Sequence, residues 1–251
     1  MSLIRFDRVG LKLKDRLIIS NVNFEVEEGE TLILLGRSGS GKTTLLKMIN
    51  RLIAPTSGEV LLKGEPINGL DPIQLRRSIG YSVQSTELFP HMTVGENIAL
   101  VPFLLNWPKD HIKARIDTLL RLFHLSPSQY RDRYPSSLSG GQQQRIGVAR
   151  ALAADPPILL MDEPFGALDP MTRRSIQDEF LELSKQMKKT VIFVTHDIDE
   201  ALMLGDRILL IDRGRIQQIG TKEEFLTNPA SPFVERFFAK NKKEEEPCLS
   251  Y

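Results

Sequence analysis

The chain contains short runs of apolar residues, rich in Val, Ile and Leu, that predict β-strands at residues 31–35, 59–62, 79–83, 158–161, 191–195 and 207–211. Most of these runs are apolar at consecutive positions, which is typical of strands buried on both faces of a sheet. Between them, apolar residues recur at spacings of three and four, which predicts helices with one apolar face. The clearest series are Ile112, Ile116, Leu119, Leu120 and Phe123, and Ile176, Phe180, Leu183 and Met187. Strands that alternate with helices predict an α/β fold around a mostly parallel sheet.

The strand signals stop at about residue 85 and do not return before residue 137. Helix signals interrupted by prolines fill this stretch, so we predict a helical insertion at about residues 85–155 within one domain that spans residues 1–239. The remaining residues, 240–251, include a run of charges with no apolar partner positions. Such a run is typical of a solvated tail.

Charge and composition narrow the class of protein. The 251 residues are 41% hydrophobic, enough for a substantial core, and 33 Lys and Arg against 32 Asp and Glu produce no long-range field that would gather nucleic acid or anionic lipid. The single cysteine, Cys248, excludes a disulfide framework or a cysteine-based zinc site within the chain. The first 15 residues are too charged for a signal peptide, and the longest apolar segment, 98–105, is far below the roughly 20 residues of a membrane-spanning helix. We therefore expect a cytoplasmic chain that does not itself cross a bilayer.

A glycine-rich loop follows the strand predicted at 31–35, and its sequence Gly36-Arg-Ser-Gly-Ser-Gly-Lys42-Thr43 matches G-x-x-x-x-G-K-[ST] at the start of a helix. The glycines let successive N–H groups turn inward around an anion. We expect Lys42 to reach the β and γ phosphates of a nucleotide and the Thr43 hydroxyl to bind Mg²⁺. An ordinary glycine turn would explain one or two of the glycines but not the Lys-Thr pair. The predicted nucleotide-binding residues here are Gly36, Arg37, Ser38, Gly39, Ser40, Gly41, Lys42, Thr43 and Thr44.

Two adjacent carboxylates, Asp162 and Glu163, end the strand predicted at 158–161. Side chains alternate along a strand, so the two should point in different directions and serve different roles. We expect Asp162 to hold the Mg²⁺ shell and Glu163 to polarise the attacking water as a general base. A pair of acids that merely ends a strand is the plainer alternative. Because a kinase for small substrates has no need of the second acid, the pair favours water as the acceptor.

A second anion-binding helix start is predicted at Leu138-Ser-Gly-Gly-Gln142, where Ser139 is expected to cap the helix and the two glycines to free backbone N–H groups. The segment Gln142-Gln-Gln-Arg-Ile-Gly-Val-Ala-Arg-Ala151 follows directly. Together with the phosphate-binding loop, these motifs make residues 3–238 resemble the nucleotide-binding subunit of an ABC transporter. The resemblance implies a P-loop NTPase core, with a mostly parallel sheet, an antiparallel β edge and an inserted α-helical subdomain.

The same resemblance implies that two copies form a head-to-tail homodimer that sandwiches two ATP molecules. The residues that would close over the γ phosphate held by the partner copy are Ser139, Gly140, Gly141 and Gln142. By the same resemblance, Gln84 contacts the metal and the attacking water, Asp169 contacts the opposite subunit, and His196 hydrogen-bonds the γ phosphate. A lone histidine at a strand end is more often a local hydrogen-bonding residue, but the companion motifs in order favour the catalytic role. The other histidines, His91, His111 and His124, lie in none of these motifs and are expected to be structural or surface residues.

One position departs from the family. Aligning residues 9–24 with the opening strand pair of the family puts Leu13 where an aromatic residue usually stacks on adenine. Leucine offers apolar contact but no π face, so selective binding of adenine is in doubt. Phe6 or Phe24 could substitute, although the strand register favours neither.

The resemblance further implies an ATPase that powers import through separate permease subunits, on the cytoplasmic face of a prokaryotic membrane. Residues 88–97 resemble the lining of the groove in which a short cytoplasmic helix of the membrane subunit docks in ABC importers. The stretches that look most like cassettes of glycine betaine, choline and other osmoprotectant importers are residues 48–52, 133–135, 142–144, 151–155 and 193–201. The implied partners are ATP, a second copy, the permease and indirectly an extracytoplasmic solute-binding protein, without nucleic acid.

Two alternatives to osmoprotectant import stay open. The first is import of methionine, amino acids or sulfonate-type solutes, because the residues that touch the solute lie on other chains. The second is a non-transport ABC ATPase that acts on nucleic acid or the ribosome. A single cassette with one cysteine and no sustained heptads argues against the second.

Overall fold

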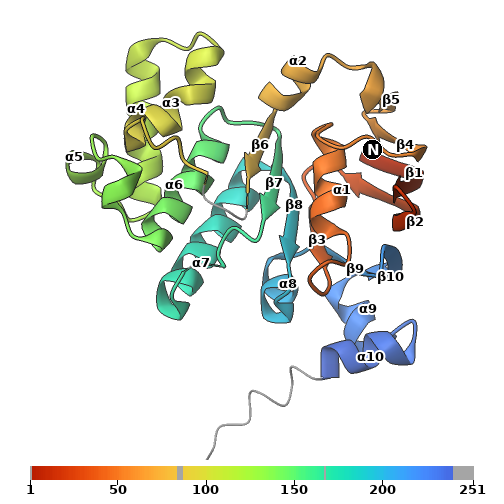
Figure 1. The fold of residues 1–251 in the computed structure, drawn as a ribbon. Helices are drawn as coiled ribbons and strands as arrows, with labels where there is room; N and C mark the ends of the chain where they lie inside the picture. The colour runs from red at the N-terminus through yellow and green to blue at the C-terminus, as the bar shows by residue number, and fades with distance from the viewer. Residues whose placement is uncertain (1, 84–86, 167, 240–251) are drawn as a thin grey trace, which may run out of the picture. The chain divides into compact units, whose positions relative to one another are not determined.

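The computed structural model describes residues 2–83, 87–166 and 168–239, with only the backbone described at 183–187, and the chain divides into two compact units (Figure 1). Unit 1 comprises residues 1–68 and 194–251, and unit 2 comprises residues 69–193. Gln84 and the predicted tail, residues 240–251, lie outside the described residues.

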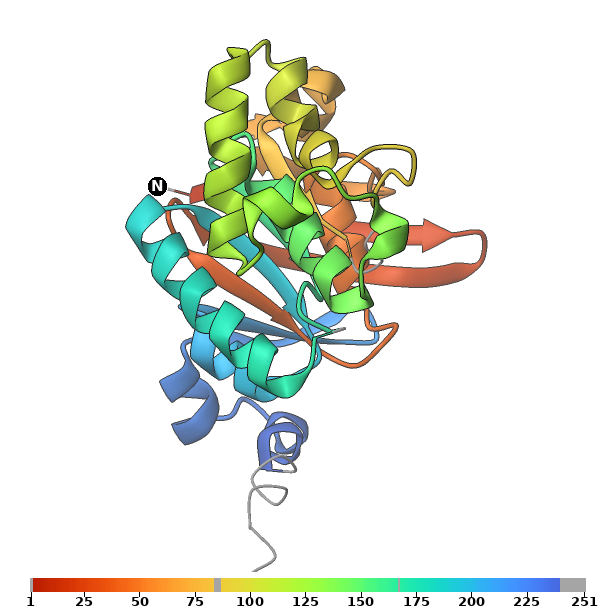
Figure 2. The same cartoon turned by 90° about the vertical axis from the view of Figure 1, so that its left-hand side faces the viewer.

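Unit 1 contains an antiparallel sheet with the strand order β2-β1-β4-β5. Its strands are β1 (Ser2–Leu13), β2 (Arg16–Glu27), β4 (Ser57–Leu62) and β5 (Glu65–Pro66). The long β1–β2 pair appears as two red strands that run side by side in Figure 2. Phe6 and Phe24 face each other across this pair and stack with ring centroids 4.4 Å apart. The sheet provides the antiparallel β part that the resemblance predicts.

Unit 1 also contains β3 (Thr31–Leu35), which pairs in parallel with β9 (Arg207–Asp212), and β10 (Arg215–Gly220), which pairs with β9 in the antiparallel sense. Every residue of β3 is buried, as its unbroken apolar run predicts. The helices of this unit are α1 (Lys42–Ile49), α8 (Ile198–Leu204), α9 (Lys222–Thr227) and α10 (Pro232–Ala239). Helix α1 begins a few residues after β3, so the end of a buried strand positions the start of a helix.

Unit 2 is built on β6 (Ile79–Ser82) and β7 (Ile158–Asp162), which pair in parallel, and it takes in the first part of β8 (Thr190–Thr195). Its helices are α2 (Pro72–Arg77), α3 (Val94–Leu104), α4 (Lys109–Leu122), α5 (Pro127–Tyr130), α6 (Gly140–Leu152) and α7 (Pro170–Met187). Helices α3 to α6 all lie within the residues predicted as a helical insertion, and they gather together in Figure 1 (yellow to green). Helix α7 packs Phe180 against Phe165 and Phe193, and Ile176 on the same predicted apolar face is buried as well, whereas the side chains of Leu183 and Met187 lie outside the description.

The strand predictions at six apolar runs agree with β3, β4, β6, β7, β8 and β9 to within two residues at each end. Apolar runs alone do not indicate β1, β2 and β10, because these strands carry polar residues between apolar ones. The α/β prediction is confirmed by the alternation of strands and helices. Within the described parts of the chain, no helix has both the length and the hydropathy needed to span a membrane.

Candidate active site

The loop between β3 and α1, residues 36–41, makes close backbone approaches that only glycine permits. A Cβ at Gly36 would overlap the carbonyl oxygen of Ile211 on β9. At Gly41, φ is 113° and a Cβ would lie 2.6 Å from the Cδ1 of Ile19. The neighbouring strands β2 and β9 therefore leave room for backbone but not for side chains, which holds the loop in a tight curve at the start of α1.

Lys42, the first residue of α1, places a positive charge inside this loop. Its side chain is buried, and its Nζ donates to the carbonyl oxygens of Gly36 at 2.7 Å and Arg37 at 3.0 Å. The Oγ of Ser40 in the same loop is buried and has no hydrogen-bond partner among the described residues. A buried cation held beside an unsatisfied hydroxyl fits a phosphate group, whose oxygens accept from both. The sequence prediction of a phosphate-binding loop therefore has a structural basis in unit 1.

Asp162 and Glu163 lie on either side of a sharp backbone turn in unit 2. Asp162 ends β7 and is buried, whereas Glu163 has φ of 47°, in the left-handed region. The carbonyl oxygen of Glu163 accepts hydrogen bonds from Gly166 N and from Gln144 Nε2, each at 3.2 Å. Burial raises the pKa of Tyr81, and the negative charge of Asp162 raises it further. The strand conformation therefore ends between Asp162 and Glu163, so the alternation of side chains along a strand does not by itself decide where the Glu163 carboxylate points.

Ser139 caps helix α6, as predicted from the sequence. Its Oγ accepts from Gln142 N at 3.3 Å, and its own N–H donates to the Oε1 of Gln142 at 3.0 Å, so the two residues form a capping box. Gln142 Nε2 also donates to the hydroxyl of Tyr130 at 3.1 Å. A Cβ at Gly140 would meet nothing within 4 Å, and the first turn of α6 carries no acidic residue. The start of this helix therefore offers an exposed positive dipole end to an anion.

His196 follows β8 on a turn that the side chains of Thr195 and Asp197 stabilise. Thr195 Oγ1 donates to Glu200 Oε2 at 2.5 Å, and Asp197 Oδ1 accepts from the backbone N–H groups of Asp199 and Glu200. His196 is exposed on this turn. Local hydrogen bonds of its neighbours therefore present the imidazole at the surface of unit 1.

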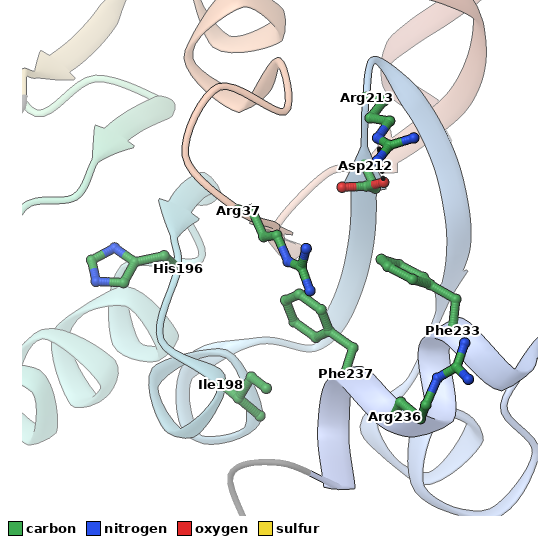
Figure 3. Close-up of a pocket in the computed structure, with 8 residues that line it drawn as sticks. All are labelled: Arg37, His196, Ile198, Asp212, Arg213, Phe233, Arg236 and Phe237. Carbon is green, nitrogen blue, oxygen red and sulfur yellow. Dashed lines mark ion pairs between the residues drawn. The ribbon is translucent and has the colours of Figure 1, made fainter.

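A cavity of about 540 Å³ lies beside this turn in unit 1 (Figure 3). It is lined by Arg37, His196, Ile198, Asp212, Arg213, Phe233, Arg236 and Phe237. Figure 3 shows Arg37 and Phe237 extending into the same space, while the imidazole of His196 extends away from Arg37. The phosphate-binding loop and α10 thus share one cavity, and sequence reasoning did not anticipate the contribution of α10.

The other predicted site residues fall in different places. Gln84 is outside the described residues. Asp169 lies just before α7, where hydrogen bonds from Thr172 lower the pKa of its exposed carboxyl. The loop residues Ser38 and Gly39 are exposed, and Thr43 and Thr44 are partly buried on α1. Unit 1 therefore brings together the phosphate-binding loop, Lys42 and His196, and unit 2 contains Asp162, Glu163, Asp169 and the residues 139–142.

Leu13 lies at the end of β1, opposite Arg16 across the hairpin, and its side chain is 54% exposed. Phe6 and Phe24, the two aromatic substitutes weighed from the sequence, are buried and stacked on each other. Their rings are therefore not available to a base.

Sequence reasoning passed over Gln144. Its side chain is buried, and the apolar residues that follow it on α6, Ile146 and Val148, are buried as well. A helix whose buried face includes a glutamine predicts a hydrogen-bond partner in the core. That pattern is the signal that could have identified it.

The comparison with known proteins agrees with these features. Residues 19–166 match the sequence model of the ABC transporter family. Over 224 residues the chain is 55% identical to the choline transport ATP-binding protein OpuBA of Bacillus subtilis, and the aligned region covers 89% of this chain and 58% of that protein. Over 239 residues it is 49% identical to the glycine betaine uptake system ATP-binding protein YehX of Escherichia coli, which covers 95% of this chain and 77% of that protein. The chain spans somewhat under two thirds of the first of these relatives.

Solved structures agree as well. The ATP-binding cassette MJ0796, determined as a dimer bound to ADP and Pi, matches with a TM-score of 0.79 and 36% identity over 87% of this chain and 98% of that one. The cassette cbiO1 of Clostridium perfringens matches with a TM-score of 0.80 and 27% identity. The fold predicted from the sequence is thereby confirmed. On the match to residues 19–166, the glycine-rich loop with its buried lysine and the capped helix start at Ser139, this chain belongs to the ABC transporter family.

Proposed function

We propose that the chain is the ATP-hydrolysing subunit of an ABC importer. The observation that carries the proposal is the buried Lys42 ammonium, held at 2.7 Å from the Gly36 carbonyl in a loop that has no room for a Cβ at positions 36 and 41. A triphosphate would replace these carbonyls as the partner of Lys42 and would accept from the backbone N–H groups of residues 36–41. The relatives OpuBA and YehX, both named as ATP-binding proteins of transport systems, support this assignment.

Mg²⁺ fits the chemistry of the predicted ligands. Thr43 and Asp162 supply a hydroxyl and a carboxylate, the oxygen ligands that Mg²⁺ prefers, and Gln84 belongs to the same predicted set. With so few protein oxygens, the remaining ligands of the ion would come from the phosphates and water, as is usual for Mg²⁺. When bound, Mg²⁺ would neutralise charge on the β and γ phosphate oxygens.

In the proposed reaction, Glu163 accepts the proton of the attacking water, and Lys42 stabilises the charge that develops on the phosphates. His196, presented on its exposed turn, hydrogen-bonds the γ phosphate. The exposed start of α6 at Ser139 serves the nucleotide of a second copy in a head-to-tail homodimer. The dimeric state of the MJ0796 cassette in its solved structure supports this arrangement.

An apolar cavity of about 560 Å³ in unit 2 supports docking of a membrane subunit. It is lined by His91, Met92, Glu96, Ala99, Leu100, Phe103, Lys109 and Ile112. The lining includes three of residues 88–97, which were predicted to line the docking groove, and Phe103 at its edge is 67% exposed. A large exposed ring next to an apolar cavity is typical of a protein interaction site. We propose that a short cytoplasmic helix of the permease occupies it, which places the chain on the cytoplasmic face of the membrane.

For the solute, we propose an osmoprotectant of the quaternary amine class, delivered by an extracytoplasmic binding protein. The relatives named for choline, for glycine betaine and, in Salmonella typhimurium, for osmoprotectant import support this class.

The test is to copurify the chain with its permease, reconstitute both in liposomes and measure ATP hydrolysis with binding protein and candidate solutes. Stimulation by glycine betaine or choline is expected. Stimulation by methionine, another amino acid or a sulfonate instead would reject the solute class. If the chain hydrolyses ATP but no membrane protein copurifies with it, the importer assignment is rejected.

The docking proposal has its own test. Phe103→Asp should reduce copurification of the permease by tenfold or more while the free chain hydrolyses ATP at an unchanged rate. Leu226→Asp is the matched control, because Leu226 is also exposed, at 44%, but lies on α9 in unit 1. Equal loss of permease with both variants would remove the cavity from its proposed role.

A further inference from the structure

Three successive glutamines at the start of α6 reach three different parts of unit 2. Gln142 closes the capping box with Ser139. Gln143 Nε2 donates to the carbonyl oxygens of Pro135 and Leu138, at 3.1 and 3.3 Å. Gln144 Nε2 donates to the carbonyl oxygen of Glu163 at 3.2 Å. The helix that starts at Ser139 is therefore hydrogen-bonded to the turn that carries the proposed general base.

That turn needs outside support. Glu163 adopts φ of 47°, a conformation that is unfavourable for a residue with a Cβ and that persists only where surrounding contacts hold it. Within the turn, Gly166 N donates to the same carbonyl oxygen. Gln144 adds a donor from a different element, and its side chain is 4% exposed, so water does not readily replace it.

We propose that Gln144 is a positioning residue, which holds the backbone of Glu163 so that its carboxylate faces the attacking water. The inference rests on the proposed function, because Glu163 must act as the base for its position to matter. It also relates the two nucleotide sites of the dimer. Helix α6 begins at the residues that would meet the partner's nucleotide. One turn later, Gln144 contacts the backbone of Glu163, the proposed general base for the chain's own nucleotide.

A merely structural role for Gln144 makes different predictions. If the amide only satisfies a buried carbonyl, its loss lowers the stability of unit 2 and affects binding and turnover alike. If it positions Glu163, its loss lowers kcat while KM and the affinity for ATP stay the same, since misplacing a reacting group by about 1 Å costs up to roughly 100-fold in rate.

The decisive variants are Gln144→Met and Gln144→Glu. Methionine fills a similar volume without a donor, and we expect kcat to fall about tenfold or more with unchanged ATP affinity. Glutamate donates an O–H to the Glu163 carbonyl only while its carboxyl is protonated, and burial raises the pKa of such a carboxyl. The activity of Gln144→Glu should therefore approach that of the wild type at low pH and fall as the pH rises, while Gln144→Met stays low throughout.

Gln177→Met is the matched control, because it removes a second buried side-chain amide of unit 2, on α7. Thermal unfolding of all three variants separates loss of fold from loss of rate. A double-mutant cycle with Glu163→Gln completes the design, since removing Gln144 should matter much less once the base is gone.

The outcomes separate the two proposals. Wild-type kcat in Gln144→Met, the same kcat loss in Gln177→Met, or the full effect of Gln144→Met in the Glu163→Gln background would each overturn the role of Gln144. Failure of the wild-type chain to hydrolyse ATP would instead overturn the proposed function itself.

Discussion

The Nζ of Lys42 lies 2.7 Å from the carbonyl oxygen of Gly36, so the first residue of α1 is hydrogen-bonded to the first residue of the loop that precedes it. The bond spans the loop and is buried. It keeps a positive charge at the place where the loop N–H groups and the helix dipole favour an anion. Charge and backbone donors are therefore prepared before a phosphate arrives.

Lys42→Ala should weaken ATP binding itself, because the charge-assisted hydrogen bonds to the phosphates are lost before any chemistry. Equilibrium titration with a fluorescent ATP analogue measures the effect, and a loss of tenfold or more is expected. Lys47→Ala on the same helix is the control and should bind normally. Unchanged affinity in Lys42→Ala would remove this lysine from the phosphate site.

Glu163→Gln should nearly abolish turnover, to a small residual rate, while leaving ATP binding intact, because the amide keeps the shape of the side chain but cannot accept the proton of water. Loss of a general base typically costs about 10²–10⁴ in rate. The variant should also accumulate as an ATP-bound dimer in size-exclusion chromatography. Glu59→Gln, at an exposed position of β4, serves as the control. A monomeric Glu163→Gln in the presence of ATP would contradict the dimer.

Ser139→Arg should block ATP-driven dimerisation with little effect on ATP binding by the monomer, since in the proposed dimer the start of α6 serves the partner's nucleotide. The substitution also removes the cap of α6, which costs about 1 kcal/mol of stability. Thr221→Arg controls for that loss, because Thr221 forms the same kind of capping box on α9, away from α6 in the chain. Sedimentation in the presence of ATP should show a monomer for Ser139→Arg and a dimer for Thr221→Arg. Equal loss of nucleotide binding by the Ser139→Arg monomer would mean that both motifs serve one nucleotide within one copy.

Leu13→Tyr should tighten ATP binding and introduce a preference for ATP over GTP. Stacking of a base on an aromatic side chain contributes roughly 1–3 kcal/mol, and the exposed leucine supplies only apolar contact. Wild type should discriminate weakly between the two nucleotides, because the phosphate-binding loop does not contact the base. Titration of both proteins with both nucleotides tests this. A strong preference for ATP in the wild type, unchanged in Leu13→Tyr, would show that another residue holds the base and that the alignment of the first strands is wrong.

The capping residue Ser139 and the phosphate-binding loop could be predicted because their partners lie within a few positions along the chain. The Ser139–Gln142 capping box spans three residues, and the loop leads directly into the helix that it opens. The strand predictions at residues 31–35 and 158–161 succeeded for a related reason. Strands buried on both faces are apolar throughout, so their pattern does not depend on which neighbour they pair with.

The hydrogen bond from Gln144 to Glu163 joins residues that the sequence separates by 19 positions, and no periodicity indicates such a pair. The same holds for the stacking of Phe6 on Phe24, which withdraws both rings from any base, and for the cavity that α10 shares with Arg37. The sequence by itself determined the elements, the phosphate-binding loop and the family, because these follow from local backbone preferences and short-range hydrogen bonds. Only the tertiary structure decided which buried donor meets the backbone carbonyl of Glu163 and which aromatic rings are already paired, because those contacts depend on how distant segments pack together.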